Sequence, residues 1–209
     1  MRSNLQLTVG VQALLVTFLG CGAALAQGKI ATVVPGKSLG RVSLGMSPAQ
    51  VHRLLGKPDK TLRLKNGLLD DLYKAKTTRP DGNSGAVTRD RVEVLYRGGR
   101  AVQLEATSPD FRTASGISTG SDVDALRASV YNWRLLQYSY PVDDGGWTNY
   151  YFWDGGRGLT FEFQGWQEGL LGSSRPTTLI VHGKGARVIA DIGGVFESES
   201  RSLFPALAN

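Results

Sequence analysis

The sequence predicts an α+β fold made of two tandem units, each a short helix packed on a four-stranded antiparallel sheet. Three observations predict it: one stretch of sequence recurs, strand-forming segments follow each copy, and glycine-rich turns separate those segments. The chain has 209 residues, of which 41% are hydrophobic and 27 are glycine. It is therefore long enough to bury a core, and it is expected to turn often.

Residues 1–26 have the three zones of a secretory signal peptide. Arg2 precedes an apolar run over residues 9–19, and an A-x-A cleavage motif ends at Ala26. We therefore expect cleavage after Ala26 and an exported protein, periplasmic or secreted, that begins at Gln27.

Cys21 offers an alternative to that route. It lies just after the apolar run, where a bacterial lipoprotein carries its acylated cysteine, and acylation would make the protein an outer-membrane lipoprotein. It is also the single cysteine of the chain. Cleavage after Ala26 would therefore leave no cysteine for a disulfide, a thiol nucleophile or a zinc site.

The formal net charge of +6 is a mild excess for a chain of this length. Basic residues alternate with acidic ones, as over residues 88–91, and no run of five or six cations occurs. A solvated basic surface of this kind indicates solubility, so no nucleic-acid partner is expected.

A segment near the start of the mature chain recurs in its second half. Residues 42–55 align without a gap on residues 117–130. In each copy a residue that can cap a helix, Ser47 or Asp122, precedes a short apolar-periodic run, and Pro48 suits a first helical position. The pattern predicts one amphipathic helix of about three turns in each unit.

The alignment makes two structural predictions. Gly45 and Gly120 are expected at equivalent backbone positions before the helices, and Leu55 and Val130 are expected beneath the helices. The apolar stripes of the two helices are Val51, Leu54 and Leu55 in the first, and Val123, Leu126 and Val130 in the second.

Alternating segments after each helix predict the strands. In the first unit these are residues 61–65, 71–76, 92–97 and 102–106, with turns at 66–67 and 98–99 and a long loop at 77–90. In the second unit they are residues 133–140, 148–153, 159–163 and 177–182, with turns at 143–146 and 154–156. The domains are therefore residues 27–110 and 111–183, followed by a C-terminal tail over 184–209.

Residues 40–56, Gly-Arg-Val-Ser-Leu-Gly-Met-Ser-Pro-Ala-Gln-Val-His-Arg-Leu-Leu-Gly, carry a G-M-[ST]-x-x-Q-V-x-x-x-x-G pattern. This segment resembles the opening of the beta-lactamase inhibitory protein and of the SmpA/OmlA outer-membrane lipoproteins. The two-unit layout is also similar to that of the inhibitory protein. The resemblance implies a concave sheet surface used for protein contacts, and no inhibitory residue carries over.

No pattern in the chain indicates catalysis, a metal or a cofactor. The two histidines, His52 and His182, have no partner motif. Residues 155–158 lack the lysine of a phosphate-binding loop and lie between two predicted strands, which is typical of a hairpin turn. Asp154 and the aspartates at 81 and 143–144 have no calcium-loop spacing, and turns use aspartate for backbone reasons.

Aromatic side chains crowd into residues 133–166 of the second unit. Strand alternation puts Phe152 on one face, which we assign to the core with Phe161 and Phe163, and it puts Tyr151 and Trp153 on the outward face. Because Tyr and Trp dominate interface hot spots, that face is the candidate binding surface. The candidate residues are Tyr138, Tyr140, Trp147, Tyr151, Trp153 and Trp166.

The sequence therefore predicts an exported, non-enzymatic binding module with a protein partner that it does not identify. One alternative is a lipid-anchored accessory of the outer membrane, which requires acylated Cys21. A carbohydrate binder would use the same aromatic residues, and an enzyme is disfavoured because no catalytic group is evident.

Overall fold

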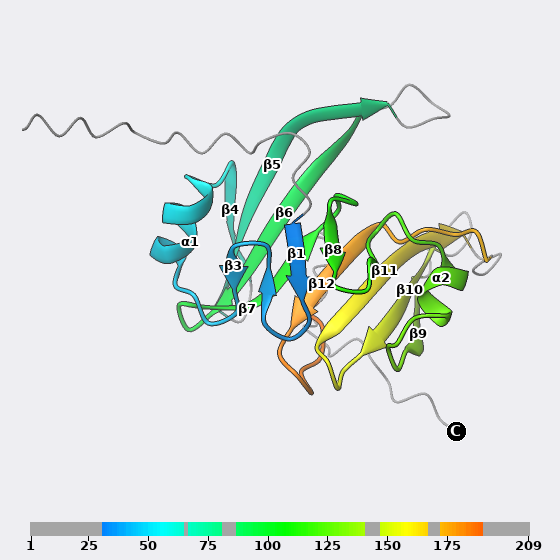
Figure 1. Cartoon of the computed structure of the whole chain (residues 1–209). Coiled ribbons are helices and arrows are strands. Elements are labelled where there is room, and N and C mark those ends of the chain that lie inside the picture. The colour runs from blue at the N-terminus through cyan, green and yellow to red at the C-terminus, as the bar shows by residue number, and fades with distance from the viewer. Residues whose placement is uncertain (1–30, 65–66, 81–86, 141–146, 167–171, 190–209) are drawn as a thin grey trace, which may run out of the picture.

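The computed structural model is an α+β protein in which strands predominate, with two sheets and two short helices (Figure 1). It describes residues 31–64, 67–80, 87–140, 147–166 and 172–189. The predicted signal peptide with Cys21 and residues 190–209 of the tail lie outside the described residues. The predicted α+β class is confirmed.

One antiparallel sheet of eight strands has the order β4-β5-β6-β7-β12-β11-β10-β9. Two groups of four strands meet where β7 pairs with β12, and Leu104 lies opposite Val181 there. The eight strands therefore form one sheet, not one four-stranded sheet in each unit as the sequence predicted. Each group of four strands covers one edge of the other. The strands are β4 (Lys60–Arg63), β5 (Leu68–Pro80), β6 (Val87–Arg97), β7 (Arg100–Ala106), β9 (Arg134–Tyr140), β10 (Trp147–Asp154), β11 (Leu159–Trp166) and β12 (Thr178–His182).

A second, small sheet has the order β3-β2-β1-β8. Its strands are β1 (Ala31–Val34), β2 (Ser38–Leu39), β3 (Val42–Ser43) and β8 (Phe111–Thr113). Strand β8, from the predicted second unit, pairs in parallel with β1 from the first. The sequence did not predict this sheet because segments of two to four residues are too short to show alternation.

Helix α1 (Pro48–Leu55) begins where the sequence predicts. The Ser47 hydroxyl accepts a hydrogen bond from the Gln50 N–H at 3.3 Å, and the Gln50 side chain accepts one from the Ser47 N–H at 2.8 Å. This reciprocal capping box satisfies two donors at the helix start. Val51 is fully buried, and Leu55 packs against the core from a partly buried position.

Helix α2 (Val123–Arg127) also begins at its predicted cap, since the Asp122 carboxylate accepts from the Ala125 N–H at 2.8 Å. It ends early, and Val130 is 68% exposed, so the prediction that Val130 lies beneath the helix is wrong. The Trp133 indole N–H donates to the Leu126 carbonyl at 2.7 Å. The same carbonyl accepts from the Ser129 hydroxyl at 2.6 Å, so local contacts occupy the acceptor that residue 130 would use in a longer helix.

The two aligned glycines are not equivalent. Gly45 has a φ of 82° and donates its N–H to the Ala101 carbonyl at 2.7 Å. Gly120 is not among the glycines with positive φ, and its N–H donates to the Ser118 hydroxyl at 3.1 Å. The gapless alignment therefore fails at this position.

The turn between β6 and β7 is confirmed at Gly98 and Gly99, which have φ values of 56° and 71°. Two successive positive φ values are those of a type I′ hairpin turn. A bulge after Leu95 then puts Ala101 opposite Tyr96. As a result, Ala101 is buried at a place where the sequence pattern favoured Val102.

The predicted loop over residues 77–90 is largely strand. Thr78 pairs with Arg89 and Pro80 with Val87, and residues 81–86 lie outside the described residues. The β5–β6 hairpin therefore extends beyond the rest of the sheet (Figure 1). Its Thr, Pro, Asp and Gly residues are typical of loops, which misled the prediction.

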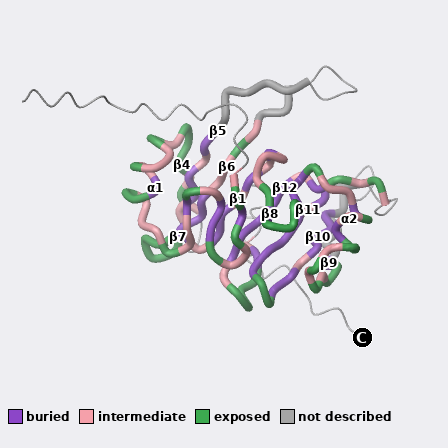
Figure 2. Tube along the Cα trace, viewed as in Figure 1, coloured by how far each residue is buried: buried purple, intermediate pink, exposed green. Residues whose placement is uncertain are grey.

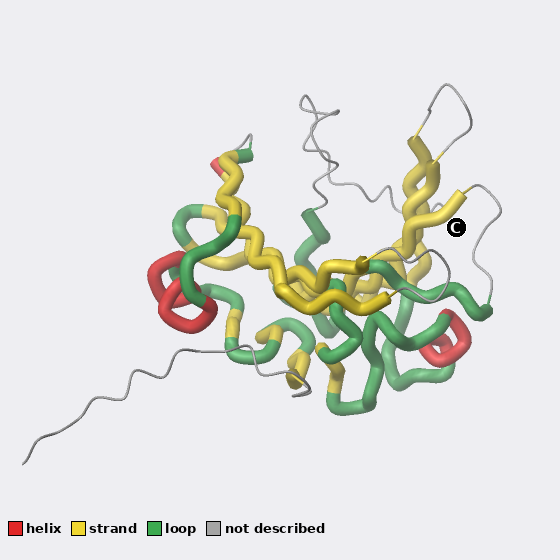
Figure 3. The backbone as a smooth tube through the Cα atoms, turned by 90° about the horizontal axis from the view of Figure 1, so that it is seen from above, coloured by secondary structure: helices red, strands yellow, loops and turns green. Residues whose placement is uncertain are grey.

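The two faces of the large sheet carry different cores. Both helices lie on the convex side of the curved sheet (Figure 3), and the main core there includes Val51, Val94, Leu104, Leu126 and Phe161. The buried residues follow the central strands (Figure 2). A smaller cluster of Leu136, Tyr151, Ile180 and Val188 lies on the opposite, concave face.

We expect Leu126→Ala to lower the free energy of unfolding by about 2 to 5 kcal/mol, because it removes a fully buried side chain next to the sheet. Val130→Ala, four residues later, should change it by less than about 0.5 kcal/mol. Urea unfolding followed by tryptophan fluorescence measures both. Equal losses in the two variants would mean that α2 continues through Val130.

Candidate functional site

The residues of the candidate aromatic surface differ in how far they are exposed. Phe152 faces the main core, and Tyr151 and Trp153 lie on the concave face, as predicted. However, Tyr151 is only 1% exposed and Trp153 is half-buried, so the expectation that Tyr151 is presented to a partner is wrong. For Tyr138, Tyr140, Trp147 and Trp166 only the backbone is described.

Residues 183–189 cover part of the concave face and explain this burial. Val188 packs with Tyr151, Ile180 and Leu136. Gln103, which is 1% exposed, accepts a hydrogen bond from the Ile189 N–H at 2.7 Å and donates to the Ile189 carbonyl at 2.6 Å. One side-chain amide thus replaces a strand partner for Ile189.

Three carboxylates lie on the same face. Glu105 is half-buried, with its carboxyl group enclosed, and accepts from the Gln103 amide at 2.6 Å. Burial raises the pKa of Glu105 to about 8, and the neighbouring Glu93 carboxylate adds to the rise. Burial also raises the pKa of Glu162, which accepts from Asn149 at 2.9 Å. Glu105 is therefore protonated at neutral pH.

Both histidines belong to internal polar contacts. His182 is 1% exposed, with Nε2 2.9 Å from the Thr160 hydroxyl and Nδ1 3.0 Å from the Gly183 carbonyl. Burial lowers the pKa of His182, so the ring is neutral. His52 on α1 lies 2.8 Å from the fully buried carboxylate of Asp71, and this contact ties the helix to the sheet.

An open cavity of about 350 Å³, here called the junction pocket, lies where five chain segments converge. Its lining comes from the segments after β1, β8, α2 and β12 and from the β10–β11 turn. The lining residues are Pro35, Ala114, Ser115, Val130, Tyr131, Arg157 and Lys184. It therefore combines apolar surface, one aromatic ring, a hydroxyl and two cations.

Close backbone contacts hold these segments together. The Gly36 N–H donates to the Gly158 carbonyl at 3.1 Å, and the His182 N–H donates to the same oxygen at 3.1 Å. A Cβ on Gly36 would lie 2.6 Å from the Arg157 carbonyl oxygen, and one on Gly158 would lie 2.3 Å from that of His182. Both glycines also have positive φ values. Only glycine permits this approach.

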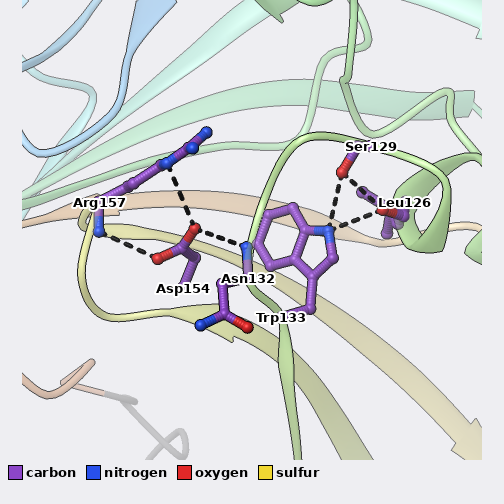
Figure 4. A network of polar contacts seen from close by, with 6 residues as sticks. All are labelled: Leu126, Ser129, Asn132, Trp133, Asp154 and Arg157. Atoms are coloured by element: carbon purple, nitrogen blue, oxygen red, sulfur yellow. Dashed lines mark hydrogen bonds and ion pairs between the residues drawn. The ribbon is translucent and has the colours of Figure 1, made fainter.

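A stack of side chains runs from the pocket into the core. The Arg157 guanidinium lies 5.0 Å above the Tyr131 ring, which is 4.9 Å from the ring of Trp133. Trp133 in turn meets Phe161 edge-on at 5.8 Å. Figure 4 shows Trp133 fixed through its indole N–H to Leu126 and Ser129. The aromatic wall of the pocket is therefore anchored to the core.

Asp154 organises the turn that carries Arg157. Its two carboxylate oxygens accept from the Arg157 N–H and the Asn132 N–H, both at 3.0 Å (Figure 4). The residues at 155–158 therefore form a hairpin turn, as predicted. Since Asp154 binds these donors, it contributes to backbone structure, while the other aspartates considered for calcium, at 81 and 143–144, lie outside the described residues.

Within the described ranges, no three His, Cys, Asp or Glu residues form a group that could hold a metal ion. No helix in the same ranges has the length and apolar character needed to cross a membrane.

Sequence reasoning did not select Tyr131, Arg157 or Lys184. They are far apart in the chain, and each occurs in a short connection that resembles an ordinary turn. The single available signal was Arg157, a cation within a glycine-rich turn. Its meeting with Lys184 depends on the pairing of β11 with β12.

Comparisons with known proteins do not assign the chain to a family: no family model and no curated protein matches. A cysteine-rich secretory protein from Staphylococcus aureus subsp. aureus Mu50 is similar at a TM-score of 0.43 and 12% identity, over 75% of this chain and 49% of that chain. This chain thus spans about half the length of that protein. The uncharacterised protein YfeY from Escherichia coli is similar at 0.44 and 11%, over 74% and 99%.

At these TM-scores neither similarity supports a functional argument. Neither structure belongs by name to the families that residues 40–56 resemble, so that resemblance stays a prediction.

We expect the raised pKa of Glu105 to make the protein less stable as pH rises from 4.5 to about 8. The unfolded chain loses this proton near 4.5 while the folded chain keeps it, so folding weakens by about 1.4 kcal/mol per pH unit from this group. Glu105→Gln should remove that part of the slope in urea unfolding at several pH values. Asp124→Asn, at an exposed carboxylate, serves as control. An unchanged slope in Glu105→Gln would contradict the assignment.

Proposed function

We propose that this protein is an exported, non-enzymatic binding module that contacts a protein partner through the junction pocket. The observation that carries the proposal is the exposure of Val130 beside an anchored Tyr131 and two cations. Tyrosine and arginine are enriched among residues that dominate binding energy, and rigid anchoring lowers the entropy lost on association.

Two further observations support this choice of surface and class. The concave aromatic face is a weaker candidate, because residues 183–189 already cover Tyr151. The contacts of His182 fit the same class, since both of its ring nitrogens are engaged within the scaffold.

We also propose that the fold consists of two related units. Each of the two helices is capped by the residue that the aligned sequences supply, Ser47 or Asp122, and each precedes four consecutive strands of the large sheet. Val42 and Ile117 are both buried in the main core, which supports the alignment at that position.

Photo-crosslinking in the cells that make the protein tests the proposed contact. A photoreactive amino acid at position 130 should give one discrete adduct with a partner protein. Lys184→Glu should abolish this adduct because it reverses a charge at the pocket, whereas Lys57→Glu, the same change at an exposed site outside the pocket lining, should leave it intact. No adduct at position 130, or equal loss in both variants, would contradict the proposal.

The alternative, a lipid-anchored envelope accessory, depends on Cys21. Mass spectrometry of the exported protein separates the two. We expect an N-terminus at Gln27, whereas an acylated N-terminal Cys21 would establish the alternative.

A further inference from the structure

Two cationic residues line the junction pocket. Arg157 and Lys184 both line it, on different loops. A Cβ on Gly36 would lie 3.1 Å from Cγ of Lys184 and 2.6 Å from the Arg157 carbonyl, so the turn after β1 touches both residues. The glycine contact thus brings the Arg157 backbone and the Lys184 side chain to one turn, and two cations line one pocket, which favours an anionic ligand.

Arg157 is held in position before any ligand binds. Its backbone is fixed by Asp154, and its guanidinium is fixed by the Tyr131 ring at 5.0 Å. The ion pair with Asp154 is long, at 3.8 Å, and uses Nε, while the two Nη nitrogens lie at the far end of the side chain (Figure 4). The side chain is 50% exposed, so its Nη donors can reach a ligand.

The charge and the apolar surface of the pocket favour an anionic group on an apolar body. Asp154 offsets part of the charge of Arg157. Within the described ranges, Lys184 forms no ion pair. The pocket therefore keeps a net positive charge for an anionic group. The exposed side chain of Val130 and the neighbouring Pro35 provide an apolar wall beside that charge.

We propose that the junction pocket binds a carboxylate carried on an apolar body, and that in the protein partner this group is an acidic side chain next to an apolar one. The inference rests on the proposed function, because it specifies the chemistry of the same contact. The cavity of about 350 Å³ is large enough for one such side chain or for a small aromatic acid.

Titration of the mature chain, residues 27–209, with benzoate tests the pocket without the partner. Amide NMR signals of Gly36, Ser115 and Gly185 should shift in a saturable way, with a Kd of about 1 to 10 mM for a ligand of this size. Benzamide, the neutral analogue, should bind at least about fivefold more weakly. Arg157→Gln and Lys184→Gln should each weaken benzoate by a similar factor, and Lys57→Gln should not.

Thermal unfolding verifies that the variants remain folded. Equal binding of benzamide and benzoate, tighter binding of inorganic phosphate than of benzoate, or an equal effect of Lys57→Gln would overturn the inference. If benzoate fails to bind while the adduct at position 130 persists, the inference alone is wrong. If benzoate binds and the adduct is absent, the proposed protein contact alone is wrong.

Discussion

The pairing of β7 with β12 is the constraint on which the rest of the structure depends. Leu104 and Ala106 face Val181 and Leu179 across it, and all four are fully buried. This seam turns two groups of four strands into one sheet with one continuous convex core. The other edge of β12 pairs with β11, and this second pairing places the residues after β12 next to the β10–β11 turn at the junction pocket.

Local chemistry was readable from the sequence. Ser47 and Asp122 act as helix caps, Gly98-Gly99 forms a tight turn, and Phe152 and Tyr151 face opposite sides of the sheet. Each of these features depends on neighbours within a few residues, whose spacing the sequence records directly. For the same reason the α+β class was predictable.

Long-range contacts were not readable in this way. An indole seven residues beyond Leu126 binds the carbonyl at the end of α2, and Val188 packs on the buried Tyr151. The contact of Gln103 with Ile189 joins positions 86 residues apart. Local periodicity does not indicate such partners. It therefore predicted the face of the sheet on which Tyr151 lies, but not that residues 183–189 bury it there.

The central position of β12 has a consequence for how the chain acquires its fold. During synthesis, strands β4 to β7 can pair as soon as they have been made. Strands β7 and β11 cannot be joined until β12, residues 178–182, has also been made. Contacts between such distant segments form slowly because a long loop must close first. Most of the chain must therefore be made before the eight-stranded sheet can close.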